Sequence, residues 1–211
     1  MIYLGIDPGL DGGIAMLMNS ANPSRPPVTQ VWKTPVIAGK DYDIQGMRKI
    51  LKDVLEIRLP ILAVIENQIS MPGQGLTSTL QTGKGFGIWL GLLAGLGLPY
   101  QVIGAKSWQS KLFTGVKGTL DTKAKSEIIA KRLFPDVDFR KSERATKAND
   151  GLTDAILIAE YARRIHKGDD KVQISGVPHE TIPENPDVCL NCGNYIPNAD
   201  PNDCPAQRLF P

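Results

Sequence analysis

The stretch Ile2-Tyr3-Leu4-Gly5-Ile6-Asp7-Pro8-Gly9, near the start of a chain of 211 residues, indicates most directly how the chain folds. Its first five residues are apolar or small, its sixth is a carboxylate, and Pro8 and Gly9 then predict a turn. We therefore expect a buried strand over residues 2–7 that ends on Asp7. A second run, ILAVIE over residues 61–66, has the same form and ends on Glu66, as expected for another central strand.

The segments around these two runs alternate between strand and helix patterns, which predicts an α/β domain with a mixed five-stranded sheet flanked by helices. Strands are expected over residues 2–7, 14–18, 28–33, 61–66 and 100–103. Helices are expected over residues 43–57, 76–97, 106–113, 121–134 and 149–166. Residues 169–211 differ, because they hold seven of the sixteen prolines and little periodic apolar pattern. We predict a main domain over 1–168 and a small Cys-containing module or tail over 169–211.

Two further acids, Asp150 and Asp154, lie one helical turn apart near the start of the last predicted helix, so they share a helix face. With Asp7 and Glu66 they offer four carboxylates, the ligand type that hard divalent cations such as Mg²⁺ or Mn²⁺ prefer. Two such ions about 4 Å apart can stabilise the attacking and the leaving oxygen at a phosphodiester. Both histidines lie late in the chain, so metal-activated water is the expected nucleophile.

Each acid also has an ordinary structural interpretation. Asp7 can simply end a strand in a turn, and Asp150 can cap the helix N-terminus. Asp154 lies in the first turns of the same helix, where carboxylates are favoured by the helix dipole. Glu66 is the hardest to explain in this way, because a carboxylate at the end of five apolar residues needs a partner or a metal.

Charge is unevenly distributed, although the whole chain carries only +2. Between residues 106 and 147, eleven Lys and Arg stand against five acids, a local net charge of +6. Residues 169–211 carry seven acids against two basic residues, a net charge of −5. The basic middle favours a polyanionic partner for the main domain, and a solvated helical surface is the alternative.

The acidic segments resemble those of the RuvC-type Holliday junction resolvases, which have a ribonuclease H-like fold. The segments are Ile6-Asp7-Pro8-Gly9, Ile65-Glu66 and DGLTDAILIA over 150–159. Bacterial members space the last two acids three residues apart, whereas this chain spaces them four apart. Either spacing keeps both acids on one helix face.

Three further segments resemble the branch of that family that includes the chloroplast resolvase and some phage enzymes. They are GFGIWLG over 85–91, Ser107-Trp108-Gln109, and residues 126–135, which end in Leu-Phe-Pro. The resemblance covers roughly residues 1–165. The small size of the chain and its similarity to phage enzymes indicate a phage or prophage origin.

The resemblance implies a Mg²⁺- or Mn²⁺-dependent endonuclease with Asp7, Glu66, Asp150 and Asp154 as catalytic metal ligands. It also implies a homodimer that resolves a four-way DNA junction by paired symmetric nicks, in recombination and repair. The segments in which family members carry phosphate-contacting lysines contain Lys111, Lys123 and Lys125.

A loop of sequence MPGQG over residues 71–75 follows Glu66 closely, at the carboxyl end of a central strand, where ligands bind in open α/β sheets. We hypothesise that this loop enters the junction centre and that Met71 or Gln74 contacts bases. An ordinary connection between a strand and a helix is the alternative.

Glycines recur at every fourth position of the helix expected over 76–97, which places them on one helical face. Each costs about 1 kcal/mol relative to alanine inside a helix, so the stripe indicates close approach of another backbone. That backbone belongs either to the sheet beneath or to the partner helix of a dimer. The glycines are Gly83, Gly87, Gly91 and Gly95.

The three cysteines lie in the tail. Cys189-x-x-Cys192, Cys204 and the upstream His179 offer a Cys₃His set for structural Zn²⁺. A small Pro-rich segment without a core is of the kind that needs a metal to fold. A disordered tail with incidental cysteines is the alternative.

Three other functions stay open. A nuclease of the same fold can act on other branched DNA or on RNA–DNA hybrids. A non-catalytic junction-binding module is a second alternative, although the presence of all four acids argues against it. The actin-like or sugar-kinase ATPase fold also ends its first strand in an acid followed by glycine, but it needs a second phosphate-binding strand pair and usually a longer chain.

The sequence also predicts the compartment. No apolar run reaches membrane-spanning length, and the start of the chain has no basic segment before an apolar core. An odd number of cysteines argues against a disulfide framework. We therefore expect a cytoplasmic protein, in a bacterium or a phage-infected cell, with no membrane partner.

Overall fold

The computed structural model describes residues 1–19, 27–68, 73, 75–115 and 120–167. At its centre is a five-stranded sheet with the strand order β3-β2-β1-β6-β7. The strands are β1 (Ile2–Asp7), β2 (Gly13–Met18), β3 (Val28–Lys33), β6 (Ile61–Glu66) and β7 (Tyr100–Ile103). β2 pairs antiparallel with both β1 and β3, whereas β6 runs parallel to both β1 and β7. The sheet is therefore mixed, with β1 in the middle.

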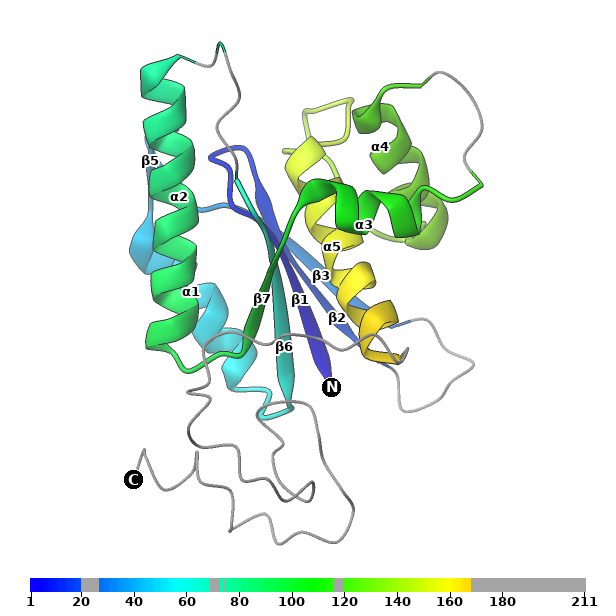
Figure 1. Ribbon diagram of the computed structural model, residues 1–211, viewed down its shortest axis with the longest axis horizontal. Helices are drawn as coiled ribbons and strands as arrows, with labels where there is room; N and C mark the ends of the chain where they lie inside the picture. The colour runs from blue at the N-terminus through cyan, green and yellow to red at the C-terminus, as the bar shows by residue number, and fades with distance from the viewer. Residues whose placement is uncertain (20–26, 69–72, 74, 116–119, 168–211) are drawn as a thin grey trace, which may run out of the picture.

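Helices cover both faces of this sheet (Figure 1). One face carries α1 (Ile44–Leu55) and α2 (Leu76–Gly95), and the other carries α3 (Ala105–Leu112), α4 (Thr122–Leu133) and α5 (Asp150–Lys167). A short hairpin of β4 (Val36–Ile37) and β5 (Asp41–Tyr42) precedes α1. Leu4 belongs to the core under α1 and α2, whereas its neighbour Tyr3 belongs to the core under α5. Burial on both faces explains why β1 and β6 read as continuous apolar runs.

The predicted α/β architecture is confirmed, with a mixed five-stranded sheet and flanking helices in the expected order. Helix bounds differ from the prediction by one or two residues, because end positions depend on local caps. Asp121, for example, lies just before α4 and accepts a hydrogen bond from the Ala124 N–H. The β4–β5 hairpin was not predicted, since its two-residue strands are too short to show alternation. The domain boundary near residue 168 stays a prediction, because residues 168–211 lie outside the described residues.

Two glycines let α5 approach the first strand and its turn very closely. A Cβ atom added at Gly5 would lie 2.1 Å from the backbone oxygen of Ala155, and one added at Gly151 would lie 2.3 Å from that of Asp11. Such distances are impossible between real atoms, so the observed packing requires a residue without Cβ at both positions. As a result, the first turn of α5 lies beside the carboxyl end of β1.

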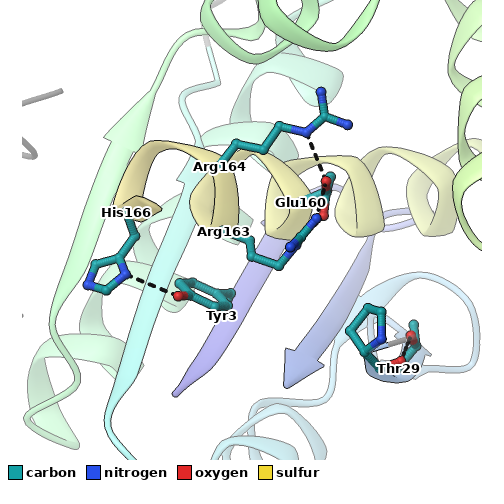
Figure 2. Close-up of polar contacts among 7 residues, drawn as sticks. Tyr3, Thr29, Glu160, Arg163, Arg164 and His166 are labelled. Atoms are coloured by element: carbon teal, nitrogen blue, oxygen red, sulfur yellow. Dashed lines mark hydrogen bonds and ion pairs between the residues drawn. The ribbon is translucent and has the colours of Figure 1, made fainter. Parts of the chain in front are cut away.

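The C-terminal half of α5 carries polar contacts within the helix and one to β1 (Figure 2). The carboxylate of Glu160 is 2% exposed and accepts hydrogen bonds from Arg163 and Arg164. Nearby, the Tyr3 hydroxyl and His166 Nδ1 are 3.1 Å apart. Since an α-helix rises 1.5 Å per residue, His166 lies about 18 Å along α5 from Asp154. Within the described ranges, no helix is long and apolar enough to span a bilayer.

Candidate functional site

The four acids singled out in the sequence lie in one neighbourhood, at the carboxyl ends of β1 and β6. β1 and β6 are parallel neighbours and Ile6 pairs with Ile65, so the residues that follow, Asp7 and Glu66, stand side by side. Asp150 and Asp154 come from the first turns of α5, which packs on β1. The charges of the other three acids all raise the pKa of the Asp7 carboxyl, so all three lie in its neighbourhood.

This crowding changes the ionisation of the acids. Burial, followed by the charges of Asp154, Glu66 and Asp150, raises the pKa of Asp7 to about 7, although the Gly9 N–H opposes the shift. Burial also raises the pKa of Asp154 to about 7, with further contributions from Glu66 and Asp150. Burial raises the pKa of Glu66 as well. Like charges held together in a partly buried site are unfavourable, which is the electrostatic setting of a cation site.

Two of the acids have specific partners. Glu66 Oε2 accepts a hydrogen bond of 2.7 Å from the indole Nε1 of Trp108, which opposes the rise in the Glu66 pKa. Asp150 Oδ2 lies 2.7 Å from Lys123 Nζ. Both of these side chains are at least half exposed, so this ion pair contributes little to stability.

Among the described residues, the Asp154 carboxylate has fewer hydrogen-bond partners than those of Glu66 and Asp150. Its Oδ1 is buried and has no hydrogen-bond partner within the described ranges. The buried hydroxyl of Ser126 on α4 lies near enough to lower the Asp154 pKa, yet Ser126 Oγ has no hydrogen bond of standard geometry. A buried carboxylate oxygen without a partner requires an explanation, and a bound cation provides one.

The residues present therefore fit a hard divalent cation. All four donors are carboxylates, which suit Mg²⁺ or Mn²⁺ better than Zn²⁺. Within the part of the chain that the structure describes, however, no three His, Cys, Asp or Glu side chains are gathered in a ready-made metal-binding group. Two of the four carboxylates are in contact with other side chains, Glu66 with Trp108 and Asp150 with Lys123.

The three predicted lysines take different positions. Lys123 contacts Asp150 directly, and Lys125 follows two residues later on α4. Lys111 on α3 lies instead over the Tyr161 ring, with Nζ 5.8 Å from the ring centroid. Tyr161 is about 10 Å further along α5 than Asp154, so Lys111 lies beside the acidic cluster rather than in it.

The other predicted site residues cannot be placed. Met71 and Gln74 lie outside the described residues, as do the zinc candidates His179, Cys189, Cys192 and Cys204. The loop contacts and the zinc site therefore stay predictions.

Trp108 and Ser126 were not predicted as site residues. Both lie in segments that carry the family resemblance, but their contacts with Glu66 and Asp154 depend on how α3 and α4 pack. One signal was available for Trp108, since it lies five residues after Ile103, which pairs with Glu66 across β6 and β7. Trp108 follows the end of β7, the parallel neighbour of β6, by only a few residues, so its side chain can reach the site.

No protein-family model matches the chain. The chloroplast Holliday junction resolvase MOC1 of Chlamydomonas reinhardtii is 28% identical over an alignment that covers 66% of this chain and 18% of that protein. The chain thus spans less than a fifth of the length of this curated relative.

Solved structures give the fold. A Thermus thermophilus RuvC structure aligns with a TM-score of 0.50 and 18% identity, over 78% of this chain and 96% of that chain. Another, T. thermophilus RuvC in complex with a Holliday junction substrate, aligns with a TM-score of 0.49 and 16% identity over the same shares. The first alignment confirms the RuvC-like, ribonuclease H-like fold that the sequence motifs indicated.

Proposed function

We propose that this chain is a divalent-metal-dependent endonuclease that resolves four-way DNA junctions by paired, symmetric nicks. The observation that carries the proposal is the meeting of four carboxylates at the carboxyl edge of a ribonuclease H-like sheet, with an orphaned oxygen on Asp154. Sequence similarity to an algal Holliday junction resolvase supports the same substrate.

Within this proposal, Asp7, Glu66, Asp154 and Asp150 hold Mg²⁺ or Mn²⁺. The bound ions supply an activated water and stabilise charge on the leaving oxygen of the phosphodiester. The chain itself contributes position: β1 and β6 fix two carboxylates at adjacent strand ends, and α5 supplies the other two. Lys123 contacts one oxygen of Asp150, and its exposed ammonium would also be placed to contact a phosphate beside the bound cation.

The surface around the acids suits a nucleic-acid backbone. α3 and α4 lie on the same face of the sheet as α5 (Figure 1). Lys123 and Lys125 extend from the first turns of α4, and Lys111 on α3 lies over Tyr161, further along α5 than the acids. Contacts of this kind position a duplex without reading its sequence and make affinity dependent on salt.

We further propose that α2 forms the contact between two copies of the chain. Among the described residues, a Cβ atom added at any of Gly83, Gly87, Gly91 or Gly95 would meet no atom within 4 Å, so the sheet beneath does not explain the stripe. Leu76 and Leu80, on the same helix, are 86% and 70% exposed. A face of small residues with exposed leucines supports close packing of a second α2.

The proposal is tested with a panel of labelled substrates and the wild-type protein beside Glu66→Gln. A four-way junction, a linear duplex, a three-way branch and an RNA–DNA hybrid are incubated with Mg²⁺. We expect nicks in the four-way junction, and at least a 100-fold loss of rate in the variant, the size seen when one electrostatic catalytic group is removed. Cleavage of the hybrid would keep the metal site but overturn the substrate, and junction binding without cleavage would indicate a non-catalytic module.

A further inference from the structure

We propose that Trp108 is a positioning residue for Glu66, whose indole N–H holds one carboxylate oxygen so that the other is left to bind a cation. The inference rests on the proposed metal-dependent function. In the proposed mechanism Trp108 contacts neither DNA nor metal, and it acts only through Glu66.

The contact is direct and comes from a rigid part of the fold. Trp108 Nε1 donates to Glu66 Oε2 at 2.7 Å, and the Trp108 side chain is fully buried. Its ring meets Phe113 edge to face, with centroids 5.6 Å apart and planes at 89°. A ring packed in this way has little freedom to rotate, so the direction of its N–H is fixed.

The position of Trp108 follows from the sheet. Glu66 pairs with Ile103 across β6 and β7, and the Asn67 N–H donates to the Ile103 carbonyl at 2.6 Å. The chain passes from Ile103 through Gly104 into α3, which brings Trp108 back over the end of β6. The strand pairing that places Glu66 therefore also places the donor that orients it.

A second buried tryptophan provides an internal comparison. Trp89 is also fully buried, in the core on the other face of the sheet, yet its Nε1 has no hydrogen-bond partner within the described ranges. Packing an indole into this protein does not by itself supply a partner for the N–H. The tryptophan that has a charged partner is the one beside the four acids, where a charge-assisted hydrogen bond is strong.

Groups that orient a metal-binding side chain commonly matter almost as much as the side chain itself. Removing such a partner typically lowers metal affinity or activity by about 10–100-fold. The Glu66 charge acts on both Asp7 and Asp154, so a fixed orientation also keeps its carboxylate beside these acids against their mutual repulsion.

The first test compares Trp108→Phe with Trp89→Phe, which removes an indole of equal burial but no hydrogen bond. Mg²⁺ and Mn²⁺ binding to the full chain is measured by titration calorimetry. We expect an affinity about 10-fold or more below wild type for Trp108→Phe, and within about twofold of wild type for Trp89→Phe. Equal affinity in all three proteins, or an equal loss in both variants, would overturn the inference.

A second measurement needs no substitution and therefore remains informative if Trp108→Phe fails to fold. The indole N–H resonances of the three tryptophans in ¹⁵N-labelled wild-type protein are followed during titration with Mg²⁺ and then Mn²⁺. We expect the Trp108 resonance to shift with Mg²⁺ and to broaden with Mn²⁺ before those of Trp32 and Trp89. An unmoved Trp108 resonance at saturating Mg²⁺ would contradict the proposal.

These outcomes are separable from the fate of the proposed function. If the metal moves Trp108 but no junction is cut, the positioning role stands and the junction substrate is wrong. If Trp108→Phe cuts junctions with the metal dependence of wild type, the function stands and the positioning role is wrong.

Discussion

Asp7 and Asp154 occupy positions in which ionisation of either carboxyl is unfavourable. Burial is the main reason that the pKa of each is raised to about 7, and the neighbouring acids add to it. When both carboxyls are ionised they do not stabilise the folded protein, because without a metal each charge lacks a counter-charge. A divalent cation reverses this balance, since an opposite charge favours the ionised form.

The raised pKa values predict how stability of the metal-free protein depends on pH. In the unfolded chain these aspartates titrate near the ordinary value of 3.8, so between about pH 4 and 7 the folded state binds more protons. The contribution of each group to stability is complete below pH 3.8 and is lost as the pH rises through about 7.

We therefore expect Asp154→Asn to stabilise the metal-free protein at pH 8 and to change it little at pH 4. The gain should be of order 1 kcal/mol after allowance for solvent screening, or about 2–4 °C in melting temperature for a chain of this size. Added Mg²⁺ should stabilise wild type more at pH 8 than at pH 5, and this response should be lost in the variant. Thermal melts of both proteins and of the exposed control Asp53→Asn test this, and equal melting temperatures for wild type and Asp154→Asn at pH 8 would count against it.

Lys125 should contribute to binding through the phosphate backbone. We expect Lys125→Ala to weaken junction affinity and to reduce the slope of log affinity against log salt by about 1. Lys49→Ala is the matched control, because Lys49 lies on α1 across the sheet and is 74% exposed. Fluorescence anisotropy with a labelled junction over a salt series measures both effects, and wild-type affinity and slope in Lys125→Ala would remove this lysine from the interface.

At the scale of elements, sequence periodicity predicted every strand of the main sheet and every helix. A continuous apolar run such as residues 61–66 predicts a strand that is buried on both faces. The sequence placed Asp7 and Glu66 at the ends of two buried strands, and the parallel pairing of β1 with β6, which brings them side by side, comes from the structure. Contacts between side chains on separate elements were not predictable, because they depend on packing: Trp108 reaches Glu66, and Lys111 lies over Tyr161.

The α2 stripe gives a prediction at the same scale. Gly91→Leu should leave the folded chain at least as stable, because no atom within the described ranges lies within 4 Å of an added Cβ atom and glycine is a poor helix former. The same change should shift the protein from dimer to monomer. Light scattering with parallel thermal melts tests this, with Gln45→Leu on the exposed surface of α1 as control. A stable Gly91→Leu dimer would show that the copies meet elsewhere.

For the whole molecule, the mixed sheet separates two surfaces. The face with α3, α4 and α5 carries Asp150, Asp154 and the basic helices, whereas α2, with its glycine stripe, lies on the other face (Figure 1). Asp7 and Glu66 end the strands β1 and β6 between the two faces. Each copy in a dimer formed through α2 brings its own set of four acids. Two sites in one assembly are what paired nicks in a single junction require.

The most direct test of this account uses a supercoiled plasmid that extrudes a cruciform, a four-way junction within closed DNA. If both strands are cut during one binding event the plasmid becomes linear, whereas independent single cuts give an open circle first. With Mg²⁺ we predict linear product from wild type without accumulation of open circle, and neither product from Asp154→Asn. Accumulation of open circle before linear product, or equal cleavage by Asp154→Asn, would contradict the central claim that four carboxylates in each of two copies cut one junction in concert.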